Sequence, residues 1–534
     1  MAHNRRAILA GASLALFGGG LAPTAAQATR AEPIATTASG KVRGAWNREV
    51  AVFKGVPYGG PTAGSGRFRP PQPVRPWSGV RDALAFGASS PQGQPAASAR
   101  AERPRNSLND QPISDDCLFL NVWTRGLADG KRRPVMVWLH GGGFSAGTGS
   151  WPSTDGTRLA ERGDVVVVTL NHRLSAFGFL YLADLGGAEF ADSGNAGMLD
   201  IVQALRWVKQ NIAAFGGDPG NVTIFGESGG GAKVSVLMGM PAARGLFHRA
   251  IVQSGAHLTG LGREEATENA RLVMKALDLA PGGVGKLQAA PIDALLGAII
   301  TAQRTPGRTP ASFSPVMDGR SLPAHPWLDG APAISAHVPV LIGSTRTETT
   351  LLVGAADPST FELDAVSLRA KLGPWLKGAD MEAVITAFQA ADPKATPSDL
   401  FFAITTDLRV RKQSWALADR KAAQGGAPVW MYELHFDQSA RMRSPHAMDV
   451  PLVFDNPPAG AIPGTTEVAA AMASTWVAFA RHGDPNNAAV PKWPAYTAGD
   501  HTAMLFEPRP RLAHHWRDDE RAALAALPVM RVDR

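Results

Sequence analysis

The sequence predicts an α/β fold in which a mostly parallel central sheet is flanked by helices on both faces. Short runs of consecutive apolar residues alternate with helical patterns, and continuous apolar strands are typical of parallel sheets buried on both faces. Hydrophobic residues make up 45% of the 534 residues and charged residues 19%, which is typical of a globular chain with a large core. Strands alternating with helices indicate right-handed crossover connections.

The expected strands and one helix follow one another along the chain. Five Val-, Ile- and Leu-rich runs read as buried strands: 134–139, 164–170, 222–225, 250–253 and 339–342. Between the second and third runs, apolar side chains recur at helical spacing: Leu199, Val202, Leu205, Val208 and Ile212. This spacing predicts an amphipathic helix over 199–214.

Two stretches read as loops. Residues 88–113 are rich in Ser, Pro, Gln, Asn and Arg, which predicts a long surface loop. Residues 305–335 form a second, Pro-rich stretch, and no internal repeat is visible. Because the chemical motifs lie on both sides of each loop, we expect a single domain over residues 29–534.

The first 28 residues read as a signal peptide. Arg5 and Arg6 precede the apolar stretch 7–22, and Ala26-Gln27-Ala28 supplies a small-residue cleavage pattern. A membrane anchor is the alternative, but an apolar run of about 16 residues broken by three glycines is short of the ~20 residues that span a bilayer. The paired arginines resemble a twin-arginine signal, with a general secretory signal as the rival. We therefore expect a periplasmic or secreted bacterial protein with no stable membrane anchor.

Composition excludes several classes of partner. The single cysteine rules out an intrachain disulfide framework and a zinc site built on several cysteines. The net charge of +7 comes from 53 basic and 46 acidic residues that are well mixed, whereas nucleic-acid binding calls for a basic stripe or a known motif. No metal-ligand pattern or dinucleotide fingerprint appears, so we expect no cofactor and a small-molecule substrate. The sequence does not indicate an oligomeric state.

A glycine-rich serine motif follows the strand over 222–225. Gly226-Glu227-Ser228-Gly229-Gly230 leads directly into a helical pattern over 231–238, the strand–turn–helix setting of a nucleophile elbow. Such a serine sits on a strained turn, and its neighbours must lack bulk so that strand and helix can approach. The helix N-terminus favours developing negative charge. The alternative is an ordinary glycine-rich turn, but this setting predicts Ser228 as a nucleophile.

A second glycine-rich motif, His140-Gly141-Gly142-Gly143-Phe144, ends the strand over 134–139. A tetrahedral intermediate carries an oxyanion that needs preorganised N–H donors, and glycines let backbone N–H groups turn inward. A phosphate-binding loop is the alternative, but no Gly-Lys-Ser/Thr follows. The loop therefore indicates oxyanion stabilisation.

These and further motifs resemble the type-B carboxylesterase family, which includes cholinesterases and bacterial para-nitrobenzyl esterases. The similarity extends from residue 53 to residue 496. Its further motifs are Phe53–Tyr58, Arg67-Phe68, Asp115–Val122, Asn171–Arg173, Gly178–Leu180, Gly194–Asp200, Phe215–Pro219 and Trp493–Tyr496. The resemblance implies one α/β-hydrolase domain and a Ser–His–Glu triad.

The family places its acid in a Gly-x-x-x-Asp-Glu-Gly pattern. This chain has Gly343-Ser-Thr-Arg-Thr-Glu348-Thr, in which Glu348 matches and threonines replace the flanking Asp and Gly. One alternative is that Glu348 is a surface residue paired with Arg346. The nearest rival acid is Asp318, in the Pro-rich stretch.

The triad histidine that the resemblance implies is His446. Its segment resembles the family's His-Gly-x-Glu loop, with Ala447 replacing Gly and Asp449 replacing Glu. The order Ser, then acid, then His is that of this fold. The chief rival is His435, which lies in a strand pattern over 430–436.

The resemblance assigns a role to each of these groups. His446 takes the proton of Ser228, which attacks the ester carbonyl, and Glu348 holds the imidazole tautomer. Water then cleaves the acyl-enzyme by the same route. The implied oxyanion hole consists of the N–H groups of Gly142, Gly143 and Gly229. The family usually has alanine at position 229, and only the N–H is needed, so we expect Gly229→Ala to keep activity.

Three further residues match family positions without a settled role. Ser254 matches a serine near the triad acid, where either a supporting hydrogen bond or an ordinary strand-end serine fits. Glu227 precedes the nucleophile and serves either electrostatic tuning or structural pairing. Cys117 matches a cysteine that is disulfide-bonded in animal relatives, and without a partner it is expected to be a buried free thiol.

The sequence thus predicts a serine carboxylesterase. An amidase, lactonase or thioesterase acting through the same triad is the alternative, because acyl-transfer chemistry is shared. A non-catalytic binding protein of the cholinesterase type is more remote, since the three triad residues are present. Residues 88–113 contain no aromatic residue, which disfavours choline esters. Family members with a Gly-Gly-Gly loop often accept esters of bulky alcohols.

Overall fold

The computed structural model of the chain describes residues 30–93, 111–304 and 313–529. Contacts divide the chain into two units, Met1–Glu32 and Pro33–Arg534. The predicted signal peptide over 1–28 lies outside the described residues. All elements named below belong to the second unit.

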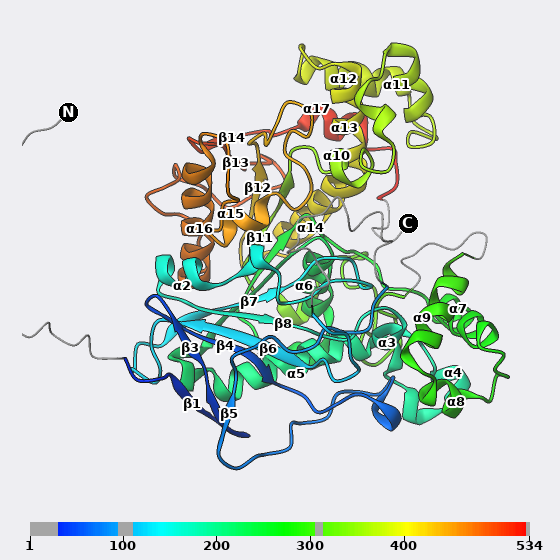
Figure 1. Cartoon of the computed structure of the whole chain (residues 1–534). Coiled ribbons are helices and arrows are strands. Elements are labelled where there is room, and N and C mark those ends of the chain that lie inside the picture. Colours follow the sequence, from blue (N-terminus) through cyan, green and yellow to red (C-terminus); the bar gives the residue numbers. More distant parts are fainter. Residues whose placement is uncertain (1–29, 94–110, 305–312, 530–534) are drawn as a thin grey trace, which may run out of the picture. The chain divides into compact units, whose positions relative to one another are not determined.

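A large mixed sheet forms the centre of this unit (Figure 1). Its eleven described strands follow the spatial order β14-β13-β12-β11-β10-β9-β7-β8-β6-β4-β3. The strands are β3 (Ala45–Asn47), β4 (Val50–Pro57), β6 (Phe119–Thr124), β7 (Arg133–Leu139), β8 (Val166–Leu170), β9 (Gly217–Glu227), β10 (Arg249–Gln253), β11 (Val340–Thr345), β12 (Val429–Leu434), β13 (Ala503–Phe506) and β14 (Arg511–Ala513). Every pairing between β8 and β13 is parallel, and the strands beyond them on both sides are antiparallel.

Smaller elements surround this sheet. A three-stranded sheet consists of β1 (Ile34–Thr37), β2 (Gly40–Arg43) and β5 (Val80–Asp82). The described helices are α2 (Thr157–Gly163), α3 (Ser175–Phe179), α4 (Ala183–Gly186), α5 (Ala196–Asn211), α6 (Gly229–Gly239), α7 (Arg263–Ala276), α8 (Val284–Ala289), α9 (Ile292–Gln303), α10 (Thr349–Leu352), α11 (Ala365–Leu372), α12 (Met381–Ala391), α13 (Pro397–Thr406), α14 (Lys412–Ala423), α15 (Asp449–Val453), α16 (Thr465–His482) and α17 (Asp518–Ala523). Within the described residues, no helix is both long and apolar enough to cross a bilayer.

The alternation of side chains along β7 shows how both faces of the sheet are buried. Val135, Val137 and Leu139 belong to one core, together with side chains of α5 and α6. Met136 and Trp138 belong to a second core, together with side chains of α2 and α16. Because successive residues of a strand point to opposite faces, a continuous apolar strand contributes side chains to both cores. The predicted fold class is confirmed.

The predicted elements are present, with shifted bounds. The five predicted runs coincide with β7 to β11, and the predicted helix over 199–214 is α5 followed by a 3-10 turn over Ile212–Phe215. Asp164 is not part of a strand. It ends α2 in the left-handed conformation, with φ at 42°, and β8 begins two residues later.

The prediction of a surface loop over 88–113 is wrong for residues 89–92, which are buried. Their polar side chains hydrogen-bond to the neighbouring chain. The Ser90 Oγ accepts the N–H of Leu174 at 3.0 Å, and the Gln92 side chain donates to Gly147 O at 3.0 Å and accepts the Gly147 N–H at 2.9 Å. Short polar residues are therefore buried here because they satisfy backbone groups.

Candidate active site

The residues predicted for catalysis lie at one edge of the sheet. The loop over 140–144 follows β7, Ser228 follows β9, Glu348 follows β11, and His446 lies in the loop after β12. These strands are parallel, so their carboxyl ends meet at the same edge, the usual place for ligands in such sheets.

Ser228 sits on a sharply strained turn. Its dihedral angles are φ 55° and ψ −123°, a region that non-glycine residues seldom adopt. Its N–H donates to Gln253 O at 2.8 Å, and its carbonyl accepts the N–H of Ala232 at 3.0 Å. A methyl group at Gly230 would overlap the carbonyl oxygen of Leu139, so a residue without a side chain is needed where α6 crosses β7.

Glu348 and His446 are in direct contact. The Glu348 Oε2 lies 2.5 Å from His446 Nδ1, and its Oε1 accepts the Thr345 N–H at 2.7 Å. Glu348 is completely buried. Arg346 pairs with Asp392 and Asp437, so the alternative of a surface glutamate paired with Arg346 is wrong. A carboxylate on Nδ1 fixes the tautomer that leaves Nε2 available as the reactive nitrogen.

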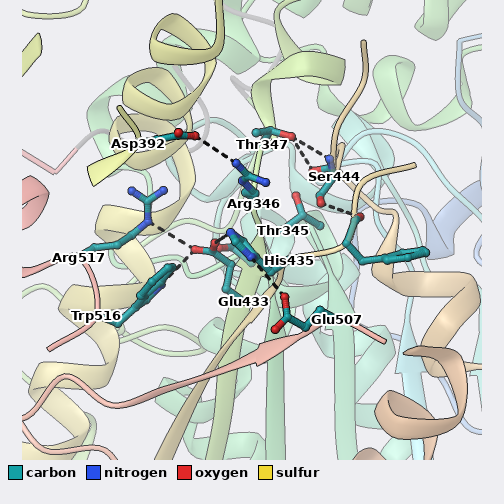
Figure 2. A network of polar contacts seen from close by, with 12 residues as sticks. Thr345, Arg346, Thr347, Asp392, Glu433, His435, Ser444, Glu507, Trp516 and Arg517 are labelled. Atoms are coloured by element: carbon teal, nitrogen blue, oxygen red, sulfur yellow. Dashed lines mark hydrogen bonds and ion pairs between the residues drawn. The ribbon is translucent and has the colours of Figure 1, made fainter. Parts of the chain in front are cut away.

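The loops that carry the acid and the histidine are tied together (Figure 2). The Thr347 N–H donates to Ser444 O at 3.1 Å, and the Ser444 N–H donates to Thr347 Oγ1 at 3.0 Å. The Thr347 hydroxyl also donates to Ser444 O at 3.1 Å. Thr347, which departs from the family pattern, thus sets the distance between Glu348 and His446.

The two rival residues lie elsewhere. Asp318 accepts hydrogen bonds from Asn195 Nδ2 at 2.9 Å and from backbone N–H groups of its own turn, which is a structural role. His435 lies 3.9 Å from Glu433 and 4.0 Å from Glu507, with its ring against Trp516 (Figure 2). It lines a cavity of about 670 Å³ whose lining contains none of Ser228, Glu348 and His446.

The second ring nitrogen of His446 faces Glu227. Its Nε2 lies 3.2 Å from Glu227 Oε1, and among the described residues no hydrogen bond joins Ser228 Oγ to His446. Glu227 and Ser228 are consecutive in the chain. Catalytic hydrogen bonds often form only once substrate is bound.

Three buried carboxyl groups shape the electrostatics around this imidazole. Burial alone would lower the pKa of His446, but the charges of Glu227 and Glu348 outweigh it and raise the pKa to about 9. Burial raises the pKa of Glu227 to about 8 and that of Asp449 to about 6. Asp449 Oδ2 accepts hydrogen bonds from Gln253 and from Tyr432, each at 2.9 Å. Such shifts are common at functional sites.

The glycine loop lies beside the nucleophile. Gly142 and Gly143 adopt φ values of 86° and 61°, which glycine tolerates without strain. The Gly142 carbonyl accepts the N–H of Ala146 at 3.0 Å, so the Gly143 N–H of the same peptide unit points the other way. A methyl group on Gly141 would lie 3.5 Å from Ser228 Cβ.

The surroundings of Gly229 argue against the expectation that Gly229→Ala keeps activity. A methyl group on Gly229 would overlap the Cα, nitrogen and carbonyl oxygen of Gly143. The backbones of α6 and of the glycine loop therefore approach closely because position 229 has no side chain. An added methyl group therefore requires the glycine loop or α6 to shift.

The structure argues against one of the two predicted roles of Ser254, whereas it agrees with the prediction for Cys117. Ser254 is buried with φ at 51°, and its Oγ has no hydrogen-bond partner among the described residues, so it does not support Glu348 by a direct hydrogen bond. Cys117 is a buried free thiol, as expected.

Sequence reasoning missed Lys233. This residue of α6 is completely buried, and its Nζ donates to His140 O at 2.8 Å. The sequence feature that could have revealed it is that Lys233 is the sole charged residue of a glycine-rich, apolar helix.

The chain is similar to known proteins over most of its length. The family model described as "Carboxylesterase family" matches residues 31–523. The chain is 36% identical to the para-nitrobenzyl esterase of Bacillus subtilis over 494 residues, covering 89% of this chain and 94% of the relative. It is 33% identical to the phenmedipham hydrolase of Pseudarthrobacter oxydans over 489 residues, covering 89% and 94%. Its structure resembles that of a carboxylesterase of Geobacillus stearothermophilus with a TM-score of 0.79, 38% identity, and coverage of 92% of this chain and 99% of the other.

Proposed function

The chain belongs to the carboxylesterase family and is a carboxylic ester hydrolase, and from this premise we propose that it acts through Ser228, His446 and Glu348 by way of an acyl-enzyme. The observation that carries the proposal is the contact between Glu348 and His446 Nδ1 at the sheet edge where Ser228 occupies a strained turn. An imidazole that a carboxylate orients is the group that activates a serine hydroxyl for attack.

The proposed reaction begins when the ring of His446 exchanges Glu227 for Ser228. Nε2 then accepts the hydroxyl proton as Oγ attacks the ester carbonyl. The N–H groups of Gly142, Gly143 and Gly229 donate to the oxyanion. The imidazolium returns the proton to the departing alkoxide, which leaves as alcohol, and water attacks the acyl-enzyme by the same sequence to release the acid.

Small esters with an aromatic alcohol are the substrates that we propose. The relative named para-nitrobenzyl esterase supports this class. An amidase, lactonase or thioesterase uses the same acyl-transfer steps, and a binding protein needs no nucleophile. Measured turnover of each substrate class therefore has to distinguish these alternatives.

The test is hydrolysis of p-nitrophenyl esters from acetate to palmitate by the wild type and by Ser228→Ala. We expect turnover that is highest for short acyl chains and falls at least about a thousandfold in the variant, because the nucleophile is lost. A p-nitroanilide, a lactone and a thioester measured alongside identify the alternatives. Fluorophosphonate labelling checks the site directly, and a folded wild type that is neither labelled nor active would contradict the proposal.

We propose in addition that the chain is exported, on the strength of Arg5, Arg6 and the Ala26-Gln27-Ala28 pattern. N-terminal sequencing of the protein from a periplasmic or secreted fraction tests this. A mature chain starting near Thr29 is expected, whereas a cytoplasmic chain that keeps Met1 would contradict export.

A further inference from the structure

We propose that Lys233 is a positioning residue for the oxyanion hole, and that its amine holds the glycine loop in place through the carbonyl of His140. The proposal rests on the proposed function, since it concerns the same site. It assigns a role in the reaction to a residue that touches neither Ser228 nor the substrate.

The environment of Lys233 is unusual for a lysine. Its side chain is completely buried, and its Nζ donates to His140 O at 2.8 Å and lies 5.9 Å from the ring centre of Phe144. Over residues 30–93, 111–304 and 313–529, no carboxylate forms an ion pair with it. Lysine is seldom buried without a counter-ion because its charge loses hydration, and burial lowers the pKa of Lys233 to about 7.

His140 links the lysine to the oxyanion hole. Its carbonyl belongs to the peptide unit before Gly141 and accepts the bond from Lys233. Its ring Nδ1 lies 2.9 Å from Gly141 O and donates to it. The Gly141 carbonyl shares its peptide unit with the N–H of Gly142, a proposed oxyanion donor. The two hydrogen bonds thus orient the peptide units on both sides of Gly141.

The tautomer of His140 agrees with this linkage. Burial lowers the pKa of His140 and the nearby charge of Lys233 lowers it further, so the ring is neutral. With its proton on Nδ1, the other nitrogen carries none, and Nε2 has no hydrogen-bond partner among the described residues. His172 stacks on the ring at 4.8 Å, and burial and Lys233 lower its pKa as well. The groups facing the amine are therefore neutral imidazoles, the Phe144 ring and a carbonyl.

A purely structural role would not explain why a lysine occupies this buried position. An apolar side chain could fill the same space without the cost of desolvating an amine. When protonated, the amine also favours a developing oxyanion at the loop, because charges in a buried site act strongly on it. Lys233 thus carries a stability cost at a position where it improves the alignment and polarity of the donor loop.

The experiment compares Lys233→Met with the wild type, and uses Lys421→Met as the matched control. Lys421, on α14, is also buried, and its Nζ donates to Ala336 O at 2.8 Å, but it lies outside the proposed site. Fluorophosphonate titration counts active sites, so kcat refers to folded enzyme alone. A trifluoromethyl ketone, which adds to Ser228 as a bound oxyanion, reports on the donor loop.

We expect Lys233→Met to lower kcat by about ten- to a hundredfold, less than the ~10²–10³ of a lost oxyanion donor. KM should stay within about twofold, since the ester before attack carries no full charge. The Ki of the ketone should rise by the same factor as kcat falls, while Lys421→Met matches the wild type in kcat and Ki. A titrated Lys233→Met enzyme with unchanged kcat and Ki would overturn the proposal.

Lys233→Leu serves if Lys233→Met does not fold, because it also removes the N–H donors and the charge at this position. A loss of kcat with a parallel rise in the ketone Ki is expected again, and unchanged values overturn the proposal. Failure of the proposed function is distinguishable, because the wild type itself would then neither hydrolyse esters nor react with the fluorophosphonate. That result would overturn both.

Discussion

One imidazole lies between two buried carboxyl groups in this molecule. Glu348 contacts its Nδ1 at 2.5 Å and Glu227 lies 3.2 Å from its Nε2. The first contact orients the ring, whereas the second occupies the nitrogen that receives the proton of Ser228 in the proposed mechanism. The two glutamates both raise the pKa of His446 but contact different ring nitrogens, and substitution separates their roles.

Glu348→Gln should reduce kcat by about 10³–10⁴. The amide of glutamine offers either its NH2 or its carbonyl to Nδ1, and it cannot stabilise the imidazolium by charge. Measuring kcat on p-nitrophenyl acetate tests this, with Asp318→Asn as the control, because the hydrogen bonds of Asp318 serve its own turn and Asn195. A Glu348→Gln enzyme that turns over at the control rate would rule out Glu348 as the triad acid.

Glu227→Gln should move the acid limb of the kcat/KM profile to lower pH. Negative charge at Glu227 helps to raise the pKa of His446 to about 9, and a base with a lower pKa loses its proton at lower pH. Wild type and variant are compared from pH 5 to pH 10 with a neutral ester. Because the two groups titrate together, the profile reports pKa values of the pair. An unchanged or upward-shifted acid limb would argue against this coupling.

At the scale of elements, the close approach of α6 to the glycine loop depends on Gly229. We expect Gly229→Ala to lower kcat by up to about a hundredfold, because the methyl group displaces Gly143 and with it an oxyanion donor. The control is Gly297→Ala in α9, where an added methyl group meets nothing within 4 Å. Wild-type kcat in Gly229→Ala, measured per titrated active site, would show that the loop can withdraw without losing its donor.

The sequence predicted those elements whose signal is local. Apolar runs revealed β7 to β11, and the serine motif placed Ser228 between a strand and a helix because its glycines are required there. The resemblance indicated Glu348 and His446, which the structure brings together although 98 residues separate them. Without that resemblance, the strand-end position of Glu348 alone would not distinguish it from other acids.

The features that the sequence did not reveal depend on segments meeting in space. Nothing in the composition of 89–92 shows that Ser90 and Gln92 satisfy the backbone at Leu174 and Gly147. Likewise, the burial of Lys233 and the overlap at Gly229 depend on where the glycine loop crosses α6. Both follow from tertiary packing, which propensity and motif spacing do not contain.

Across the whole molecule, this site is placed where the two cores meet the edge of the sheet. Side chains of α6 belong to one core, and those next to His446 belong to the other. Titratable groups are therefore enclosed by apolar packing on both sides, and burial shifts the pKa values of several of them against ionisation, among them Glu227, Asp449 and Lys233. The chemistry is thus gained at a cost in stability, as is common for active sites.

Glu227→Gln should therefore raise the melting temperature, and increasingly so at higher pH. Burial raises the pKa of Glu227 from its ordinary 4.5 to about 8, so the native state holds this proton more tightly than the unfolded chain. The stability that this proton provides is fully present below about pH 4.5 and is lost as pH rises through about 8. Glutamine never ionises, so the variant should melt close to the wild type at pH 4.5 and a few degrees above it at pH 9.

Thermal melts across this range test the prediction against Glu467→Gln, an exposed position on α16, for which the difference should not grow with pH. A difference for Glu227→Gln that stays flat or reverses would mean that Glu227 is already ionised at low pH and that its contact with His446 stabilises the fold.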